Sequence, residues 1–340
     1  MTPKSPVGSI SLAHGGGGKM SGRLIRDLIL PRLDRGKLGA LPDSVVLSDL
    51  GDKIAFTTDS FVVSPIFFPG GNIGSLSVHG TCNDLTCSGA RPIFLSVGLI
   101  LEEGFPIEEL SDILDSMSEA ADLCGVEIVT GDTKVTPKGA ADRIFINTAG
   151  IGRVETAIEL SPSRIVPGDA VIVSGPVGNH GMAVMLSRAE FSFDFDVKSD
   201  SASVWPIVER LLSLEDGLRF LRDPTRGGLS ATLNEIANLT NLTVSVDETA
   251  IPVAPEVAAA AEILGINPLE AANEGKIVAV IDRDCVNKAL DLLRDCPQAA
   301  GASFIGTITP ERKPRVIIKT RIGGSRILAE PSGELLPRIC

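Results

Sequence analysis

The chain has 340 residues, more than one ordinary hydrophobic core accommodates, so we expect two domains. Its composition, 44% hydrophobic and 22% charged, is typical of a well-buried globular protein. The 31 basic and 43 acidic side chains give a net charge of −12, which argues against nucleic acid as a partner. A polyphosphate ligand would need magnesium between the charges, or locally placed basic groups and backbone amides.

Six cysteines occur without a C-x-x-C pair, and no long apolar segment follows the first charges of the chain. Thiols without such a framework are typical of reducing compartments. The sequence therefore predicts a protein of the cytoplasm, with no signal peptide and no membrane span.

The first 22 residues are polar and rich in glycine, with four consecutive glycines in the run His14–Lys19. Such a run cannot form a stable helix or strand by itself, so a flexible loop is predicted. A Walker A motif is excluded, because Ala13 replaces its first glycine and Met20 its Ser or Thr. A lid over an anion is the remaining functional interpretation.

The first half of the chain alternates between helical and extended patterns. Apolar spacing predicts one helix at 24–33, closed near its end by Pro31, and another at 107–124, capped by Gly125. Apolar and β-branched runs predict strands at 53–60, 92–101 and 126–130. The second of these strands is apolar enough to be covered on both faces.

A domain boundary is predicted between Gly150 and Gly168, where proline, glycine and serine punctuate the chain. The second unit begins with a strand at 170–174 and the run 175–181, a G-x-x-G-x-x-G pattern that makes a weak Rossmann motif. Further elements follow in the same alternation: helical residues 204–214, the loop 223–229 before a helix, and the loop 270–275 before a strand at 276–281. The class is therefore α/β or α+β.

Four carboxylates follow predicted strands or helices and could share one Mg²⁺-nucleotide site: Asp49, Asp59, Asp84 and Asp132. Hard oxygen ligands suit magnesium, whose other positions phosphate oxygens and water fill. Each aspartate alone could equally cap a helix or turn.

Other polar residues carry weaker signals. Lys134 could lie beside the same phosphates or could be a solvated lysine, and His14 sits among glycines, as ligand contacts and ordinary loops both do. Cys82 and Cys87 lack the partners of a metal site and are predicted to pack in the core.

The chain ends on Cys340, in the sequence Pro337-Arg338-Ile339-Cys340. A terminal thiol is expected to be exposed and mobile, unlike an inert core cysteine. Two interpretations stay open on the tail alone: a frayed end, or a thiol carried on a tether that glycines near 323 and 333 let swing.

Several motifs together resemble the PurM-like (AIR synthetase-like) ATP-binding superfamily, and the resemblance covers essentially the whole chain. Within it, the tail Pro-Arg-Ile-Cys is similar to that of the HypE-type hydrogenase maturation factors. The motifs are Thr58–Val63, Asn83–Leu85, Ser88–Pro92, Gly131–Val135, Gly178–Gly181, Asp223–Gly228 and Ala272–Gly275.

The resemblance implies a two-domain PurM-like fold whose N-terminal domains pair into a dimeric β-barrel, beside which ATP and Mg²⁺ bind. It implies a homodimer with a C-terminal α/β sandwich domain and a mobile tail. The terminal cysteine would receive a carbamoyl group from the carbamoyltransferase HypF. ATP-dependent dehydration would convert it to a thiocyanate, whose cyanide passes to iron on the HypC–HypD complex. The corresponding segments are 1–40 (lid and helix), 41–158 (ATP-binding and dimerisation), 159–310 (C-terminal domain) and 311–340 (tail).

The resemblance also suggests roles for residues. Cys340 carries the reacting group, Lys134 stabilises negative charge on its oxygen, and Glu274 takes a proton from nitrogen. A salt bridge from Glu274 to Lys276 is the alternative. The lid would close over the triphosphate, and Asn179, Asp223 and Arg226 are second-domain candidates for which a folding role is the alternative. The full ATP-binding set is His14, Gly16, Gly17, Lys19, Asp49, Asp59, Asn83, Asp84, Asp132, Asn179, Asp223 and Arg226.

Two rival functions remain at this point. One is another enzyme of the superfamily, such as a selenophosphate synthetase, against which the absence of a cysteine from residues 1–22 counts. The other is a non-catalytic, nucleotide-sensing carrier whose Cys340 holds a group made elsewhere.

Overall fold

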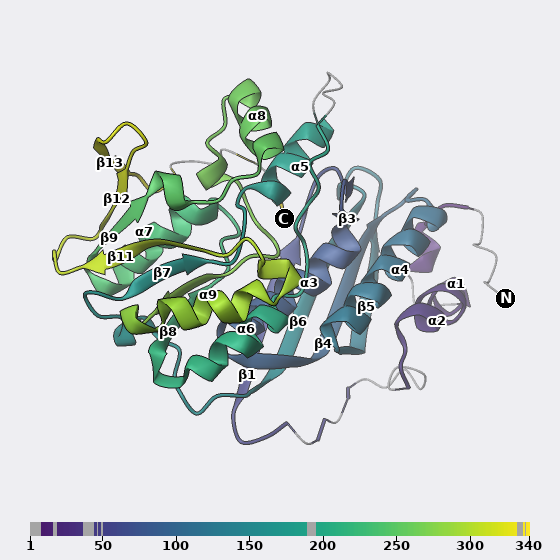
Figure 1. The fold of residues 1–340 in the computed structure, drawn as a ribbon. Coiled ribbons are helices and arrows are strands. Elements are labelled where there is room, and N and C mark those ends of the chain that lie inside the picture. The colour runs from purple at the N-terminus through teal and green to yellow at the C-terminus, as the bar shows by residue number, and fades with distance from the viewer. Residues whose placement is uncertain are drawn as a thin grey trace.

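A computed structural model describes residues 8–15, 19–36, 44–45, 47–48, 50–188, 195–331, 336 and 338–340. The chain forms two α/β domains, each built on its own mixed sheet (Figure 1). The predicted class is therefore confirmed. Of the helices that the structure describes, none combines the length and apolar character needed to cross a membrane.

The N-terminal domain is built on a four-stranded sheet in the order β1-β6-β4-β5. Helix α3 packs on one face of this sheet, and α4 packs beside α3 around the domain's core (Figure 1). The αL conformation of Gly125 ends α4, as predicted. The elements are β1 (Ile54–Phe61), β2 (Phe67–Phe68), β3 (Gly71–Asn72), α3 (Ile73–Cys87), β4 (Ala90–Glu102), α4 (Ile107–Cys124), β5 (Glu127–Thr136) and β6 (Ile144–Val154).

The opposite face of this sheet has no such cover among the described residues. Apolar side chains stand open on it: Ile54 is 51% exposed, Phe56 68% and Ile100 40%. The strand predicted at 92–101 is thus confirmed as β4, but the expectation that both its faces are covered is wrong within one protomer.

The helix predicted at 24–33 begins earlier, at Lys19, and ends at Leu33. It is continuous through α1 (Lys19–Arg23), a π-helical segment (Leu24–Ile29) and α2 (Leu30–Leu33). Pro31 does not stop it, because proline lies in the first turn of the last segment, where its missing N–H costs least. The π-helical segment directly before it is the usual irregularity of a helix that accommodates such a residue.

The C-terminal domain is a layered structure around a seven-stranded sheet, in the order β13-β12-β9-β11-β7-β10-β8. Helix α7 covers one face, with a core that includes Leu233, and α6 and α9 cover the other, with a core that includes Leu293. Helices α5 and α8 pack against each other beside the sheet. The elements are β7 (Ala170–Val173), α5 (Asn179–Arg188), α6 (Trp205–Leu211), β8 (Leu218–Arg222), α7 (Gly228–Thr240), β9 (Thr243–Asp247), α8 (Pro255–Leu264), β10 (Val278–Ile281), α9 (Val286–Arg294), β11 (Ser303–Thr309), β12 (Arg315–Lys319) and β13 (Ser325–Leu328).

The segment predicted to be a tail, 311–340, begins as part of this domain. Strand β12 pairs in parallel with β9, and β13 pairs with β12. The chain leaves the sheet only after Leu328, which is buried in the domain's core. The part that can act as a tail is therefore shorter than the sequence suggested.

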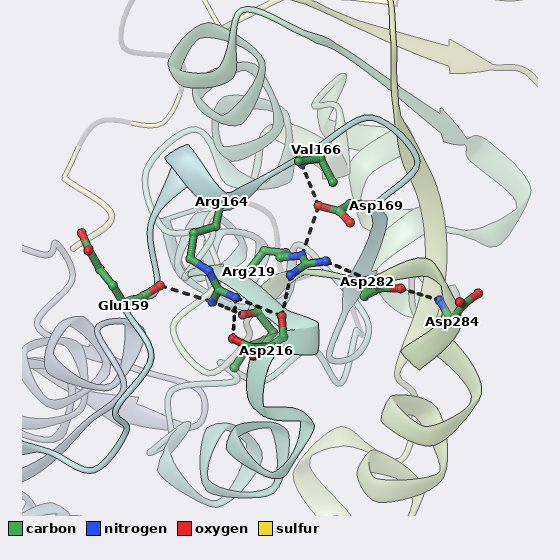
Figure 2. Close-up of polar contacts among 9 residues, drawn as sticks. Glu159, Arg164, Val166, Asp169, Asp216, Arg219, Asp282 and Asp284 are labelled. Atoms are coloured by element: carbon green, nitrogen blue, oxygen red, sulfur yellow. Dashed lines mark hydrogen bonds and ion pairs between the residues drawn. The ribbon is translucent and has the colours of Figure 1, made fainter.

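The connection between the domains is fixed to the second one by two arginines (Figure 2). Arg164 donates to the carbonyl oxygens of Leu218 and Asp216, at 2.8 and 3.0 Å. Arg219 lies 2.8 Å from Asp282 and 3.6 Å from the buried Asp169. These contacts hold the linker against the start of β8, at the boundary that the sequence predicted.

Candidate active site

The C-terminal residue is buried between the two domains. Cys340 is 8% exposed and Ile339 4%, and both belong to the apolar core of the N-terminal domain. The backbone N–H of Val62 donates to a carboxylate oxygen of Cys340 at 3.2 Å, and that of Ser64 donates to the carbonyl oxygen of Arg338 at 3.1 Å. The expectation of an exposed terminal thiol is therefore wrong, because the tail hydrogen-bonds to the chain just after β1.

The sulfur of Cys340 lies against a guanidinium. The Nε of Arg226 is 3.1 Å from Sγ, and Nη2 of the same residue is 3.6 Å from Oδ1 of Asp59. Burial, together with the charge of Glu274, raises the pKa of Cys340 to about 12, although Arg226 opposes the shift. The docked sulfur is thus a neutral thiol at the edge of a cavity of about 730 Å³, which we call the tail pocket; its lining includes Asp59, Ser60, Asn147, Arg226, Glu270 and Cys340.

Two glycine-containing loops bring the functional side chains to this pocket. Gly228, at φ +58°, sits so close to the second loop that a Cβ would lie 2.4 Å from the carbonyl oxygen of Ala271. A Cβ on Gly275 would lie 1.9 Å from the carbonyl oxygen of Asp200. Only glycine permits these approaches, which explains the glycines after Arg226 and after Glu274.

Two buried asparagines lock the same region. The side chain of Asn273 accepts from the N–H of Gly178 at 2.7 Å and donates to the carbonyl oxygen of Pro224 at 2.9 Å. Asn83 donates to the carbonyl oxygens of Ala202 and Glu274, both at 3.0 Å, and accepts from Val204 at 2.9 Å. Asn83, predicted to bind the nucleotide, therefore joins α3 to the second domain with its amide group fully used.

Glu274 is a buried carboxyl group whose Oε1 has no hydrogen-bond partner among the described residues. Burial, and then the charges of Asp223, Asp200 and Asp59, raise its pKa well above the ordinary value. The alternative salt bridge to Lys276 does not form, because Lys276 pairs with Asp200 at 3.2 Å. A carboxyl group with a raised pKa delivers a proton when it is protonated and is a stronger base than an exposed carboxylate when it is ionised.

A second, smaller cavity of about 320 Å³ holds a pair of carboxylates. We call it the acid pocket; its lining includes Thr57, Asp84, Cys87, Arg222 and Asp223. Burial, and then the charge of Asp84, raise the pKa of Asp223 to about 7. Burial also raises the pKa of Asp84, whose carboxylate accepts from Thr57 at 3.0 Å. Glu274 interacts electrostatically with both Asp223 and Cys340, so it links the two pockets.

The carboxylates of the acid pocket suit a divalent cation. Asp59 and Asp223 each raise the pKa of a neighbouring acid, so the acids repel one another when ionised. In the part of the chain that the structure describes, no three acidic, histidine or cysteine side chains form a complete metal cage. Magnesium commonly needs only one or two carboxylates, with phosphate oxygens and water completing its shell.

Asp132 and Lys134 lie elsewhere in the protomer. The sheet register places Asp132 opposite Gly98 of β4, Gly98 opposite Asn147 of β6, and Asn147 opposite Ser60 of β1. That row spans roughly 14 Å at the usual strand spacing. Side chains alternate along β1, so Asp59 faces away from Asp132. Within one protomer the predicted metal set is therefore not brought together, and Lys134 does not meet Glu274.

The N-terminal candidates surround a third cavity, of about 230 Å³, between the first helix and β5. It is lined by His14, Ile25, Leu33, Val97, Asp132 and Lys134, among others. Lys134 pairs there with Asp132 at 3.1 Å.

Other predicted residues lie outside these cavities. Lys19 begins α1, and Asn179 begins α5 with a buried Oδ1 that has no hydrogen-bond partner among the described residues. Gly16, Gly17 and Asp49 lie outside the described residues.

Sequence patterns missed the residues that hold the tail. His180 and Arg188, both on α5, donate to carbonyl oxygens of Ile339 and Arg338. His180 lies in the motif Gly178–Gly181, which does not indicate a contact with the tail, and Arg188 lies in no motif. Asn273 is likewise part of a motif, Ala272–Gly275, that could have marked it.

With this two-domain α/β fold, the chain belongs to the AIR synthase related family. Residues 42–154 match the description "AIR synthase related protein, N-terminal domain", and residues 166–319 match the C-terminal domain of the same family.

Within that family the chain belongs to the HypE hydrogenase maturation proteins. It is 47% identical to the carbamoyl dehydratase HypE of Rhizobium leguminosarum bv. viciae over 334 residues, covering 98% of this chain and 95% of that protein. A solved structure of hydrogenase maturation protein HypE in complex with ATP superposes with a TM-score of 0.92 at 46% identity, covering 97% of this chain and 99% of that one. A HypE–HypF complex gives a TM-score of 0.80 at 44% identity, covering 91% and 99%.

Proposed function

We propose that this protein is an ATP-dependent carbamoyl dehydratase of hydrogenase maturation. It would convert a carbamoyl group, carried as a thiocarbamate on Cys340, into a thiocyanate whose cyanide is transferred to iron in a [NiFe]-hydrogenase precursor. The observation that carries the proposal is the docking of a C-terminal cysteine at the edge of the tail pocket, which Asp59 and Glu270 also line, with its sulfur 3.1 Å from Arg226. The relatives named carbamoyl dehydratase match this chain over almost its whole length.

The reaction balances as the loss of one water from the tail. The thiocarbamate S–C(=O)–NH₂ gives up its oxygen to the phosphoryl group of ATP and both nitrogen protons to bases, which leaves S–C≡N, ADP and phosphate. ATP supplies the phosphoryl group that makes the oxygen a leaving group. The protein must hold the thiocarbamate still and move the two protons.

Glu274 and Arg226 are our candidates for these tasks. A carboxyl group with a raised pKa is a stronger base, once ionised, than an exposed one, so Glu274 suits removal of a proton from nitrogen. Arg226 already faces the sulfur and would hold charge that develops on the adjoining group. Lys134 keeps its proposed role at the oxygen only if a second protomer brings it to this pocket.

Magnesium would be held by Asp84 and by Asp59 or Asp223, and there it would neutralise phosphate charge. Asp49 and Asp132 stay predicted ligands, of which Asp132 would act from another protomer. The glycine run at 15–18 and Lys19 would cover the triphosphate and keep water out.

A homodimer would bring the two sets of residues together. The open face of the four-stranded sheet supports this. It presents apolar side chains such as Phe56, and Asp132 lies on β5 of the same sheet. Pairing of two such faces would close a β-barrel and cover the apolar face of β4.

The remaining partners follow from the chemistry of the tail. HypF would load the carbamoyl group, and a HypE–HypF complex is known for a relative. The HypC–HypD complex would accept the cyanide. Both reactions need the sulfur outside the pocket, so the tail must leave it in each cycle.

One experiment tests the function. The purified protein is carbamoylated with HypF, Mg²⁺-ATP is added, and the intact mass of the tail peptide and the ADP formed are followed. A dehydratase loses one water from the tail for each ADP. A carbamoylated tail that persists beside bound ATP would instead support the carrier function. Glu274→Gln and Lys134→Ala should accept the carbamoyl group and then stall.

A further inference from the structure

We propose that Arg188 and His180 of α5 are positioning residues that clamp the last three residues of the chain in the tail pocket. The hydrogen bonds of the clamp are present in this structure. Its consequence for dehydration rests on the proposed function.

Arg188 bridges the tail and the chain that follows β1. Its Nη2 donates to the carbonyl oxygen of Arg338 at 2.6 Å, and its Nε donates to the carbonyl oxygen of Ser64 at 2.5 Å. Charge-assisted hydrogen bonds of this kind are about twice as strong as neutral ones. One guanidinium therefore ties together two segments that are far apart in the sequence.

His180 holds the next carbonyl group. Its Nε2 lies 2.8 Å from the carbonyl oxygen of Ile339, and its Nδ1 lies 2.8 Å from Oγ of Ser199. A carbonyl oxygen only accepts, so Nε2 carries the hydrogen and Nδ1 accepts from the serine. Burial lowers the pKa of His180, which keeps the ring neutral in this tautomer. The edge contact with Phe68, at 5.3 Å between centroids, fixes the ring plane.

Together with Val62 and Ser64, these side chains supply donors to the carbonyl oxygens of Arg338 and Ile339 and to a carboxylate oxygen of Cys340. Arg338 adopts φ +51°, a left-handed conformation that a residue with a side chain holds only when its surroundings impose it. Its own side chain turns the other way, to the carbonyl oxygen of Val62 at 2.8 Å and to Asp142. The tail is thus held on one side by the segment just after β1 and on the other by α5.

The two sides of the clamp differ in how a substitution affects them. The contacts from the segment just after β1 are made by the backbone N–H groups of Val62 and Ser64, so they persist in any variant of α5. Those from α5 are side-chain contacts that Arg188→Gln or His180→Gln removes. Loss of one charge-assisted hydrogen bond corresponds to a change of about tenfold or more in the population of the undocked tail.

The test is the rate of alkylation of Cys340 by N-ethylmaleimide, measured by mass spectrometry on the full-length protein without ATP or partners. Wild type should react slowly, and Arg188→Gln about tenfold faster, with His180→Gln also faster. Arg188→Lys, which can reach only one carbonyl oxygen, should fall between. The half-buried Cys285 of the other domain is the internal reference, and Arg294→Gln on the surface of α9 is the matched control.

Equal alkylation of Cys340 in wild type and both α5 variants would overturn the clamp, and so would a parallel acceleration at Cys285, which would mean general loosening. In the carbamoylated protein, Arg188→Gln should load the carbamoyl group at least as fast as wild type and lose water about tenfold more slowly, with the KM for ATP unchanged. Alkylation needs no catalysis. If wild type loses no water but the alkylation rates differ as stated, the dehydratase function fails and the clamp stands.

Discussion

Arg226 and Cys340, 114 residues apart in the chain, meet with Nε 3.1 Å from Sγ. This contact identifies the cation beside the sulfur as Arg226. Arg338 is much nearer in sequence, two residues from the thiol, but its guanidinium bonds to Val62 and Asp142 instead. Proximity in sequence misleads here because the left-handed turn at Arg338 directs its side chain away from Sγ.

Substitution of Arg226 should slow dehydration. Arg226→Gln removes the charge beside the reacting group, and loss of one preorganised donor typically costs a factor of about 100 in rate. Arg226→Lys keeps the charge without the planar fork, so it should recover only part of that loss. Single-turnover loss of water from the carbamoylated tail is the measurement. Dehydration by Arg226→Gln at the wild-type rate would remove Arg226 from the mechanism.

The docked tail should be released as pH rises. The thiol has a pKa of about 12 when docked and about 8.5 when free, so above pH 8.5 only the undocked tail ionises. The ratio of docked to undocked tail therefore falls by about tenfold for each pH unit above that value. The rate of digestion of the tail by a carboxypeptidase, compared at about pH 7.5 and 9.5, measures the undocked fraction. Cys340→Ser, whose hydroxyl group does not ionise, should show no such increase after correction for enzyme rate; an equal increase would contradict this linkage.

Asp223→Asn should stabilise the protein, and more so as pH rises. The carboxyl group has a pKa of about 7 in the fold and about 4 when unfolded, so its ionisation costs the native state stability between these values. The gap in unfolding free energy between variant and wild type should grow to about 4 kcal/mol from pH 4 to 7 and then stay level. Urea unfolding at several pH values tests this. Mg²⁺ should narrow the gap at pH 8, and a gap independent of pH would show that burial does not perturb Asp223.

Asn83→Ala should loosen the domain junction. It leaves the carbonyl oxygens of Ala202 and Glu274 and the N–H of Val204 without their partner, at a cost of about 3 kcal/mol. Thermal and urea unfolding measure the loss, with the exposed Asn287→Ala on α9 as control. If the variant instead keeps its stability and loses only ATP affinity, Asn83 is a nucleotide ligand.

Phe56→Glu should abolish the proposed dimer. Phe56 is 68% exposed, on the edge strand β1 of the open sheet face, and a buried unpaired carboxylate there would strongly oppose association. Analytical ultracentrifugation should give a dimer for wild type and a monomer for the variant. Leu239→Glu, at a side chain 56% exposed on α7, is the control and should stay dimeric. A dimeric Phe56→Glu protein would place the interface elsewhere.

Much of the fold follows from local patterns in the sequence. Helix α4 and its glycine cap, strands β1 and β4, the beginning of β5 and the loops at 223–228 and 272–275 all have short-range causes: apolar periodicity, β-branched runs, and glycines where two backbones nearly touch. Strand β6 was not predicted. The motifs also determined the family and marked Cys340, Glu274 and Arg226 as residues to follow.

Tertiary structure decided which of those residues meet. Asp59 and Asp132 both end a predicted strand in a similar motif, yet register and the alternation of side chains put them on opposite faces of one sheet. The docked tail is hydrogen-bonded by His180, which lies in a glycine motif that does not indicate this contact, and by Arg188, which lies in no motif. Sequence periodicity reports which face a residue occupies on its own element, whereas the burial of a chain terminus depends on contacts between segments hundreds of residues apart.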